Sequence, residues 1–170
     1  MQTQVIWKGI YYQSLEHCTV SFGDAGNEIS STIIGEHEGQ LYKVEYQIRT
    51  NARWEVLYVH LSAQMNAVTH IWEPSLEGLV FIDISLTPFT NTLPVNSLQL
   101  GVGERRVIDL IYIDVLENEI KRTQQVYERL TNSEYLFETI DGSFRAVIRV
   151  NEQGLVVDYP GLFSLLGSHT

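Results

Sequence analysis

The chain has 170 residues, of which 44% are hydrophobic and 19% charged, and 11 basic against 21 acidic side chains give a formal net charge of -10. This is the composition of a globular protein of one domain, residues 1–170, and its negative charge argues against nucleic acid as a partner. The single cysteine, Cys18, cannot form an internal disulfide, the first residues do not resemble a signal peptide, and no apolar run approaches the roughly 18 residues of a membrane span. We therefore expect a cytoplasmic protein that is not integral to a membrane.

Two-residue alternation of apolar and polar side chains is the main secondary-structure signal along the chain. It is regular over residues 42–49 and again over 143–150. Successive side chains of a strand point to opposite faces, so these segments should bury one face and expose the other. Segments 54–63, 79–86 and 107–113 are apolar at both parities. A strand of that kind needs cover on both faces, as the inner strands of a curved half-barrel would have.

Turn signals separate these runs. Residues 24–27, 38–40, 141–142 and 151–154 are rich in Gly, Asp and Asn, which suit tight connections between antiparallel strands. Many short strands at this spacing predict a barrel or a sandwich. Residues 117–130 fit less well, because their apolar residues recur at helical spacing and the residues between them are good helix formers. A helix and a strand both stay open for this segment.

Residues 83–94 form the most unusual stretch, a strand that runs into hydroxyl-rich residues. Pro88 and Pro94 should push the residues before them toward extended geometry. Asn91 suits a turn, and the threonines can bond nearby backbone groups. We expect a rigid connection that presents Phe89.

This stretch closely resembles the signature of the bacterial family of putative glycolipid-binding proteins, Asp-hydrophobic-x-x-Thr-Pro-Phe-Thr-Asn-Thr-Leu-Pro. Further matches to the family lie in the same order along the chain: Trp7, Tyr46, Trp54, Trp72, Gly78, the pairs Gln125/Tyr127 and Phe144/Ala146, and the run 154–162. The resemblance thus extends from Trp7 to Leu162. It implies a mainly β protein, with an antiparallel curved sheet or partly open β-barrel, similar to bacterial lipoprotein-carrier-like barrels, and with at most one or two short helices. It also favours a strand over the second half of residues 117–130.

The sequence departs from the family pattern at several positions. The family usually continues its signature with Ile-Arg-Arg-Leu, whereas this chain has Val95, Asn96, Ser97 and Leu98. Gly-Cys-x-Asp is typical ahead of the signature aspartate, and here residues 78–81 lack both the cysteine and the carboxylate. An arginine expected shortly after Trp54 is also absent. These losses suggest altered recognition of polar ligand groups.

The resemblance and the residue types together define the ligand-binding candidates: Trp54, Asp83, Thr87, Phe89, Thr90, Asn91, Thr92, Gln125 and Tyr127. A buried aspartate needs hydrogen-bond partners, and Asp83 could take a ligand hydroxyl or cap the Thr-Pro turn. The segment 89–92 could form a binding rim or a rigid arch that locks two strands. Tryptophan faces suit lipid chains and sugar rings, although most tryptophans simply fill the core.

Catalytic and metal-binding patterns are weak. The five histidines lack the i, i+4 spacing of a helical metal site, and no nucleophile elbow, phosphate loop or dinucleotide fingerprint is present. We expect no metal and no cofactor. The first hypothesis is a non-enzymatic protein that holds a lipid or glycolipid in an apolar cavity of a curved sheet. The alternative is a protein-interaction or homodimerising β domain, and an enzyme that uses Asp83 for acid–base chemistry is a third, weaker reading.

Overall fold

The computed structural model describes all 170 residues and contains thirteen strands and one helix. In chain order the elements are β1 (Gln2–Gly9), β2 (Ser14–Gly23), β3 (Gly26–His37), β4 (Gln40–Thr50), β5 (Val56–Met65), β6 (Val68–Trp72), β7 (Ile82–Ile84), α1 (Phe89–Leu98), β8 (Arg105–Asp114), β9 (Glu119–Arg129), β10 (Glu134–Thr139), β11 (Arg145–Val150), β12 (Val156–Tyr159) and β13 (Phe163–His169).

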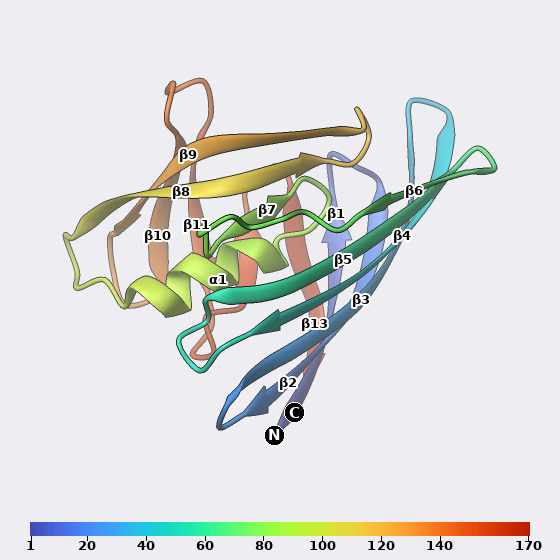
Figure 1. Cartoon of the computed structure of the whole chain (residues 1–170). Helices are drawn as coiled ribbons and strands as arrows, with labels where there is room; N and C mark the ends of the chain where they lie inside the picture. Colours follow the sequence, from blue (N-terminus) through green and yellow to red (C-terminus); the bar gives the residue numbers. More distant parts are fainter.

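All thirteen strands belong to one curved sheet in the order β6-β5-β4-β3-β2-β1-β13-β12-β11-β10-β9-β8-β7. Every pair is antiparallel except β7 with β8. The end strands β6 and β7 do not pair with each other, so the barrel stays open. β1 pairs with β13, which brings the two termini side by side, and α1 lies in the hollow of the sheet (Figure 1). The predicted mainly β fold with a curved, partly open sheet is confirmed.

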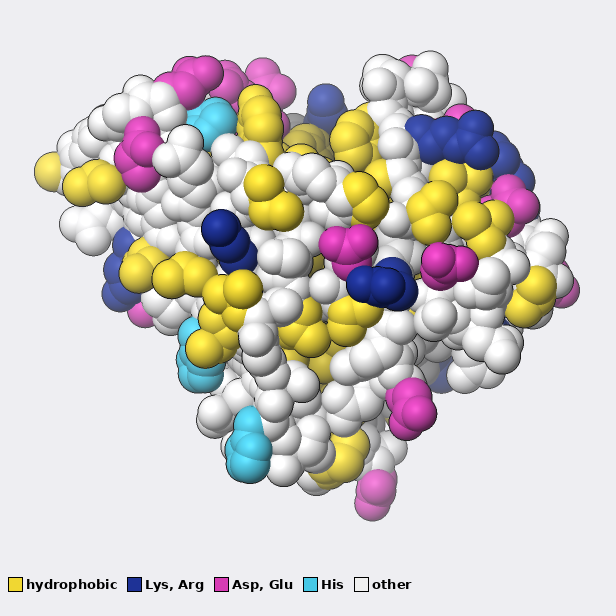
Figure 2. Space-filling view, turned by 180° about the vertical axis from the view of Figure 1, so that it is seen from behind, with side chains coloured by type: hydrophobic (Ala, Val, Ile, Leu, Met, Phe, Trp, Pro, Cys, Tyr) yellow, Lys and Arg dark blue, Asp and Glu magenta, His cyan; other side chains and the backbone are white.

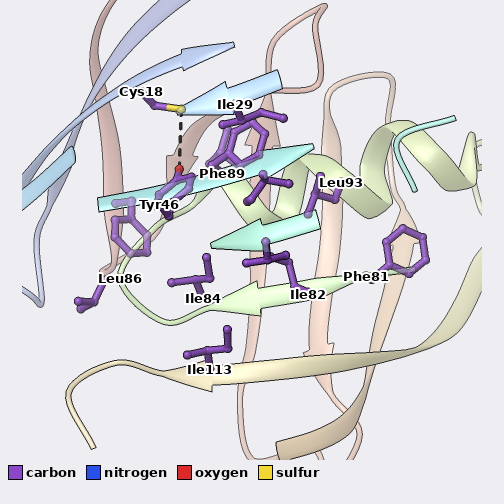
Figure 3. Packing of buried hydrophobic residues seen from close by; sticks show 14 of the residues in the cluster. Cys18, Ile29, Tyr46, Phe81, Ile82, Ile84, Leu86, Phe89, Leu93 and Ile113 are labelled. Carbon is purple, nitrogen blue, oxygen red and sulfur yellow. Dashed lines mark hydrogen bonds between the residues drawn. The ribbon is translucent and has the colours of Figure 1, made fainter. Parts of the chain in front are cut away.

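The core fills the space between the inner face of the sheet and α1. β4 shows the predicted alternation, with Tyr42, Val44, Tyr46 and Ile48 buried and the residues between them exposed. Phe89 and Leu93 lie four residues apart on one face of α1, and neither is exposed. Figure 3 shows these two side chains beside Tyr46 and the β7 isoleucines Ile82 and Ile84.

The strands and turns confirm some predictions from the sequence and correct others. The turns over 24–27, 38–40, 141–142 and 151–154 all connect neighbouring antiparallel strands, as predicted. The expectation of cover on both faces is wrong for β5, where Leu57 is 65% exposed. In β8 it is wrong only at Val107, which is 48% exposed, because Leu110, Ile111 and Ile113 are buried at both parities. In the third segment, 79–86, only Ile82–Ile84 forms a strand.

Residues 117–130 are not a helix. β9 occupies Glu119–Arg129 and pairs along its whole length with β8, and over its second half with β10. These ladder hydrogen bonds outweigh the helical spacing of its apolar residues, since propensity is a weak preference that tertiary pairing overrides.

The expectation of an extended, turn-like connection over residues 88–94 is wrong. α1 begins at Phe89 and has Pro94 inside it, although proline removes a hydrogen-bond donor from a helix interior. At its start the Thr87 hydroxyl accepts a hydrogen bond from the Phe89 backbone N–H at 3.0 Å, which satisfies one of the free donors of the first turn. Burial of residues 89–95 stabilises the helix in spite of the proline.

No helix of the structure has the length and the apolar character needed to cross a membrane.

Candidate functional site

A cavity of about 620 Å³ lies in the hollow of the sheet, beside the start of α1. Its lining comes from β7, α1, β8, β9, β10, β12 and β13, together with the loops that hold Tyr11, Tyr12 and residues 140–144. The inward side chains of β9 mark its depth. Lys121 is exposed, Thr123 is half-buried and Gln125 is buried, so the cavity has a mouth near Lys121 and a floor near Gln125.

The floor is built from Asp83, Thr87, Asn91 and Gln125. Asp83 is half-buried, and its carboxylate accepts hydrogen bonds from Thr90 Oγ1 at 3.0 Å and from Gln125 Nε2 at 2.6 Å. Burial raises the pKa of Asp83, and the bonds from Gln125 and Thr90 partly offset this effect. The carboxylate is thus held in place by two neutral donors rather than by a cation.

Asn91 joins the floor to the sheet. Its Nδ2 donates to the hydroxyl of Tyr127 at 2.8 Å, and both residues are buried. Tyr127 lies behind the floor and does not line the cavity itself. Burial raises the pKa of the Tyr127 hydroxyl well above its usual value, so it stays protonated at neutral pH.

The walls are aromatic. A continuous series of ring contacts runs from Tyr12 to Phe163 at 5.8 Å, on to Tyr159 at 6.0 Å, to Phe137 at 6.2 Å, and to Phe144 at 6.0 Å. Such edge and tilted contacts stabilise the rings against one another and leave flat apolar faces toward the cavity. These surfaces suit a hydrocarbon chain or the apolar face of a sugar ring.

The mouth carries exposed side chains of mixed character. Tyr11, Ile140 and Phe144 are 58%, 50% and 36% exposed. Asp141 and Lys121 also lie at the opening, and the Lys121 ammonium sits 5.4 Å from the ring centre of Tyr112. Lys121 is the only basic residue that lines the cavity.

Glu16 of β2 forms a second polar centre behind the floor. Its Oε1 accepts hydrogen bonds from Tyr46 at 2.6 Å, Ser31 at 2.7 Å and Thr87 at 2.9 Å, while Oε2 is buried without a partner. Burial raises the pKa of this carboxyl to about 7, against the effect of the three hydrogen bonds. Because Thr87 also lines the cavity, Glu16 supports the floor from behind.

The structure brings together only part of the predicted site. Of the nine candidates, Asp83, Thr87, Asn91 and Gln125 line the cavity, and Thr90 and Tyr127 each bond to one of them. The remaining three lie elsewhere: Phe89 and Thr92, which are buried in α1, and Trp54, which occupies the turn between β4 and β5 and packs on Phe22 at 5.9 Å. The expectation that Phe89 is presented to a ligand is therefore wrong.

Tryptophans contribute nothing to the cavity lining. Trp7 is fully buried and donates its indole N–H to the Val156 carbonyl at 2.7 Å, so it belongs to the core. Trp72 is 8% exposed and also belongs to the core. For these two residues the structural reading of the sequence holds.

Several residues of the cavity lining were not predicted from the sequence, above all the aromatic wall of Tyr12, Phe137, Tyr159 and Phe163. Nothing local marks these rings, because strands bury aromatic residues in ordinary cores as well. Glu16 did carry a signal. It has the same parity along β2 as Cys18 and Val20, which a strand pattern places on the buried face.

The departures from the family pattern do not fall at the cavity. Asn96 lies on the second half of α1 and donates to the carbonyl of Gln153 at 3.0 Å. The residues at 79–81 are also absent from the lining, and Phe81 is in the core. These departures from the family pattern therefore do not change which residues line the cavity.

The structure contains no group of three or more His, Cys, Asp or Glu side chains that could hold a metal ion. The chemistry of the cavity is that of hydrogen bonding at one end and apolar contact along the sides.

Comparisons with known proteins agree with the fold. The chain is similar to a DUF1089 family protein from Pseudomonas aeruginosa whose crystal structure is known, with 32% sequence identity, a TM-score of 0.78, and coverage of 89% of this chain and 91% of that one. The search among curated proteins gave no match. A family model described as putative glycolipid-binding matches residues 4–164, and the chain belongs to this family.

Proposed function

We propose that this protein holds an amphiphilic ligand of the glycolipid type in the cavity and does not convert it chemically. The observation that carries the proposal is the composition of the cavity, which has a polar floor around Asp83 and an aromatic wall. A glycolipid has the same two-part character. The family description points to the same class of ligand.

The size of the cavity fits one small ligand. Pockets for drug-sized molecules have volumes of about 300–1,000 Å³, and the volume here is about 620 Å³. This space suits a sugar ring with a short length of chain. The rest of a long lipid chain would have to leave through the mouth past Ile140 and Phe144.

The lining supports binding rather than turnover. It contains no histidine or cysteine, and the carboxylate of Asp83 is engaged by the neutral side chains of Thr90 and Gln125. Neither partner is a base that could activate a nucleophile. A substrate screen in which turnover appears, and is abolished by Asp83→Asn in a folded protein, would contradict this part of the proposal.

Native mass spectrometry of the purified protein tests the binding function. We expect a co-purified or added amphiphile to appear as an adduct of the wild type. Thr123→Trp would fill the cavity from the inward face of β9 and should abolish the adduct. Gln64→Trp, an exposed position on β5, is the matched control and should retain it. Repeated absence of any adduct in the wild type would count against the function.

A self-associating β domain is the second candidate, because apolar side chains are exposed on the outer face. Leu15 and Ile34 are direct neighbours on β2 and β3 and are 46% and 55% exposed. Figure 2, however, shows the hydrophobic side chains of one face in separate groups with charged side chains among them. Light scattering over a range of concentrations separates the candidates, since a monomer throughout contradicts the homodimer.

A further inference from the structure

The floor of the cavity combines polar groups with apolar side chains of the same depth, since Ile84, Phe137 and Phe163 are 0%, 4% and 3% exposed. Asn91 and Gln125 at the floor are 3% and 4% exposed, whereas Ile140 and Phe144 at the mouth are 50% and 36% exposed. A hydrocarbon chain placed at the floor would leave the polar groups of Asp83, Asn91 and Gln125 without further partners. Only a ligand group that forms hydrogen bonds can satisfy them.

Most of the unpaired polar atoms at the floor are hydrogen-bond acceptors, so they can bind donor groups of a ligand. Gln125 Nε2 is used by Asp83, so the amide oxygen of Gln125 is left without a partner in the protein. Asn91 Oδ1 is also unbonded, because only Nδ2 of this side chain meets Tyr127. Each oxygen of Asp83 accepts one hydrogen bond and has capacity for another. The floor thus offers several buried acceptors to one ligand.

Positive charge is missing from this part of the cavity. Lys121, the one basic residue of the lining, is exposed at the mouth and lies over Tyr112. The acidic side chain of Asp83 lies at the floor, and Asp114 is close enough to influence its pKa. An anionic group placed at the floor would lose its hydration and meet a carboxylate without a cation.

We infer that the cavity binds its ligand headgroup-first and selects an uncharged, polyhydroxylated headgroup, with the chain directed out through the mouth. This inference rests on the proposed function and specifies its ligand. Sugar hydroxyls supply donors to Asp83, Asn91 and Gln125 and can accept from the remaining amide N–H groups. The ring then lies against the aromatic wall, and the first methylenes of the chain reach Phe144 and Ile140.

Discrimination follows from the same groups. A sulfate headgroup has no donor and would be repelled by Asp83. A quaternary ammonium headgroup is attracted by the carboxylate and the aromatic rings, but it leaves the buried oxygens of Asn91 and Gln125 unpaired. Sites built to bond a hydroxyl discriminate strongly against ligands that lack it, because their buried polar groups then lose their partners.

Calorimetric titration with three amphiphiles of equal chain length tests the selectivity, each below its critical micelle concentration. We expect octyl glucoside to bind at least ~10-fold more tightly than octyl sulfate or octyltrimethylammonium, which corresponds to loss of one or two hydrogen bonds. Equal or tighter binding of either charged amphiphile would overturn the inference while leaving the binding function intact. If none of the three binds, the proposed function itself fails.

Two variants test whether Asp83 contacts the headgroup directly. Asp83→Asn keeps the shape of the side chain and should weaken octyl glucoside binding ~5-fold or more, since one strong acceptor is lost. Asp24→Asn removes the same charge from the exposed turn between β2 and β3, away from the cavity, and should leave the affinity unchanged. Equal effects of the two variants would contradict a direct contact with Asp83.

The orientation has its own readout in the wild type, which does not depend on the variants folding. Intermolecular nuclear Overhauser effects should connect the sugar protons of octyl glucoside with the side-chain amides of Asn91 and Gln125. The chain methylenes nearest the sugar should contact Phe144 or Ile140. Contacts between the terminal methyl of the chain and these amides would show chain-first binding and overturn the inference.

Discussion

Glu16 is the buried carboxyl that links three strands and the start of α1. It accepts hydrogen bonds from Ser31 on β3, Tyr46 on β4 and Thr87 ahead of α1, and it is 2% exposed. Hydrogen bonds to a carboxylate normally lower its pKa, but here burial dominates and raises the pKa from 4.5 to about 7. Glu16 therefore changes its charge near neutral pH in the folded protein.

The first prediction concerns the pH dependence of stability. Between pH 4.5 and about 7 the folded state binds a proton at Glu16 that the unfolded state has lost. The free energy of unfolding should therefore fall as pH rises through this window, by about 3 kcal/mol if the whole shift is expressed. Urea unfolding measured at intervals from pH 4.5 to pH 8 checks this. Burial also raises the pKa of Asp83, so this group too favours the folded state less as pH rises.

Matched variants isolate the contribution of Glu16. Glu16→Gln keeps an oxygen acceptor for the three hydroxyls and cannot ionise, so its stability should depend less on pH than that of the wild type. Glu45→Gln on the exposed face of β4 removes a charge without this effect and should preserve the wild-type slope. An unchanged slope in Glu16→Gln would show that the carboxyl is not the source.

At the scale of single residues, the sequence identified which residues form the cavity floor but not how they are arranged in space. The family signature and the Gln125/Tyr127 pair point to the right residues, because both were matched as motifs. The bonds Gln125–Asp83 and Asn91–Tyr127 join residues 42 and 36 positions apart in the chain, and no local pattern encodes such contacts. The alternation along β2 could have indicated that Glu16 is buried, because it shares the parity of Cys18 and Val20.

At the scale of elements, α1 is the segment that holds the open sheet together from inside. Phe89 is unexposed and lies 6.4 Å from the ring of Tyr46, while Leu93 extends the same buried face (Figure 3). The helix also positions Asn91 at the cavity floor. Loss of its packing should therefore affect stability and binding together.

A pair of phenylalanine truncations tests this role. Phe89→Ala should destabilise the protein by about 3–5 kcal/mol, the usual cost of removing a buried aromatic side chain. Phe144→Ala at the cavity mouth should cost less than about 1 kcal/mol and instead weaken octyl glucoside binding. Chemical denaturation and calorimetry of both variants give the comparison. Similar destabilisation by the two would contradict the assignment of Phe89 to the core and Phe144 to the mouth.

α1 and β9 show why elements were harder to predict than the fold class. The signature looked like a turn because Pro94 and three threonines disfavour a helix, yet burial of the whole segment outweighs these preferences. In β9 the apolar spacing favoured a helix, but hydrogen-bonded pairing with β8 and β10 stabilises a strand instead. In both cases the decisive contacts are tertiary.

At the scale of the whole molecule, the fold depends on the pairing of the two ends of the chain. β13 pairs with β1 from Gln4 to Gly9 and with β12, and so joins the two halves of the sheet. Alternation in β4 and the glycine-containing hairpins predicted the mainly β class correctly. They could not predict this strand order, because side-chain periodicity does not reveal which strands pair at long range.

Truncation of the chain tests the closure between the ends. Deletion of residues 163–170 removes β13 and leaves β1 and β12 with unpaired edges, so we expect aggregation or loss of the cooperative unfolding transition. Deletion of Thr170 alone should have little effect, since only its hydroxyl meets Thr3. Size-exclusion chromatography and thermal unfolding report both outcomes. A soluble, folded 1–162 fragment would show that the pairing is dispensable.

The most direct test of the central claim is an NMR titration of the isotopically labelled wild type with octyl glucoside. Chemical-shift changes should concentrate on the cavity lining, including the side-chain amides of Asn91 and Gln125 and the methyl groups of Ile84 and Ile140, and should saturate. Absence of saturable changes, or changes confined to the outer faces of β2 to β5, would contradict a ligand site in the hollow of the sheet.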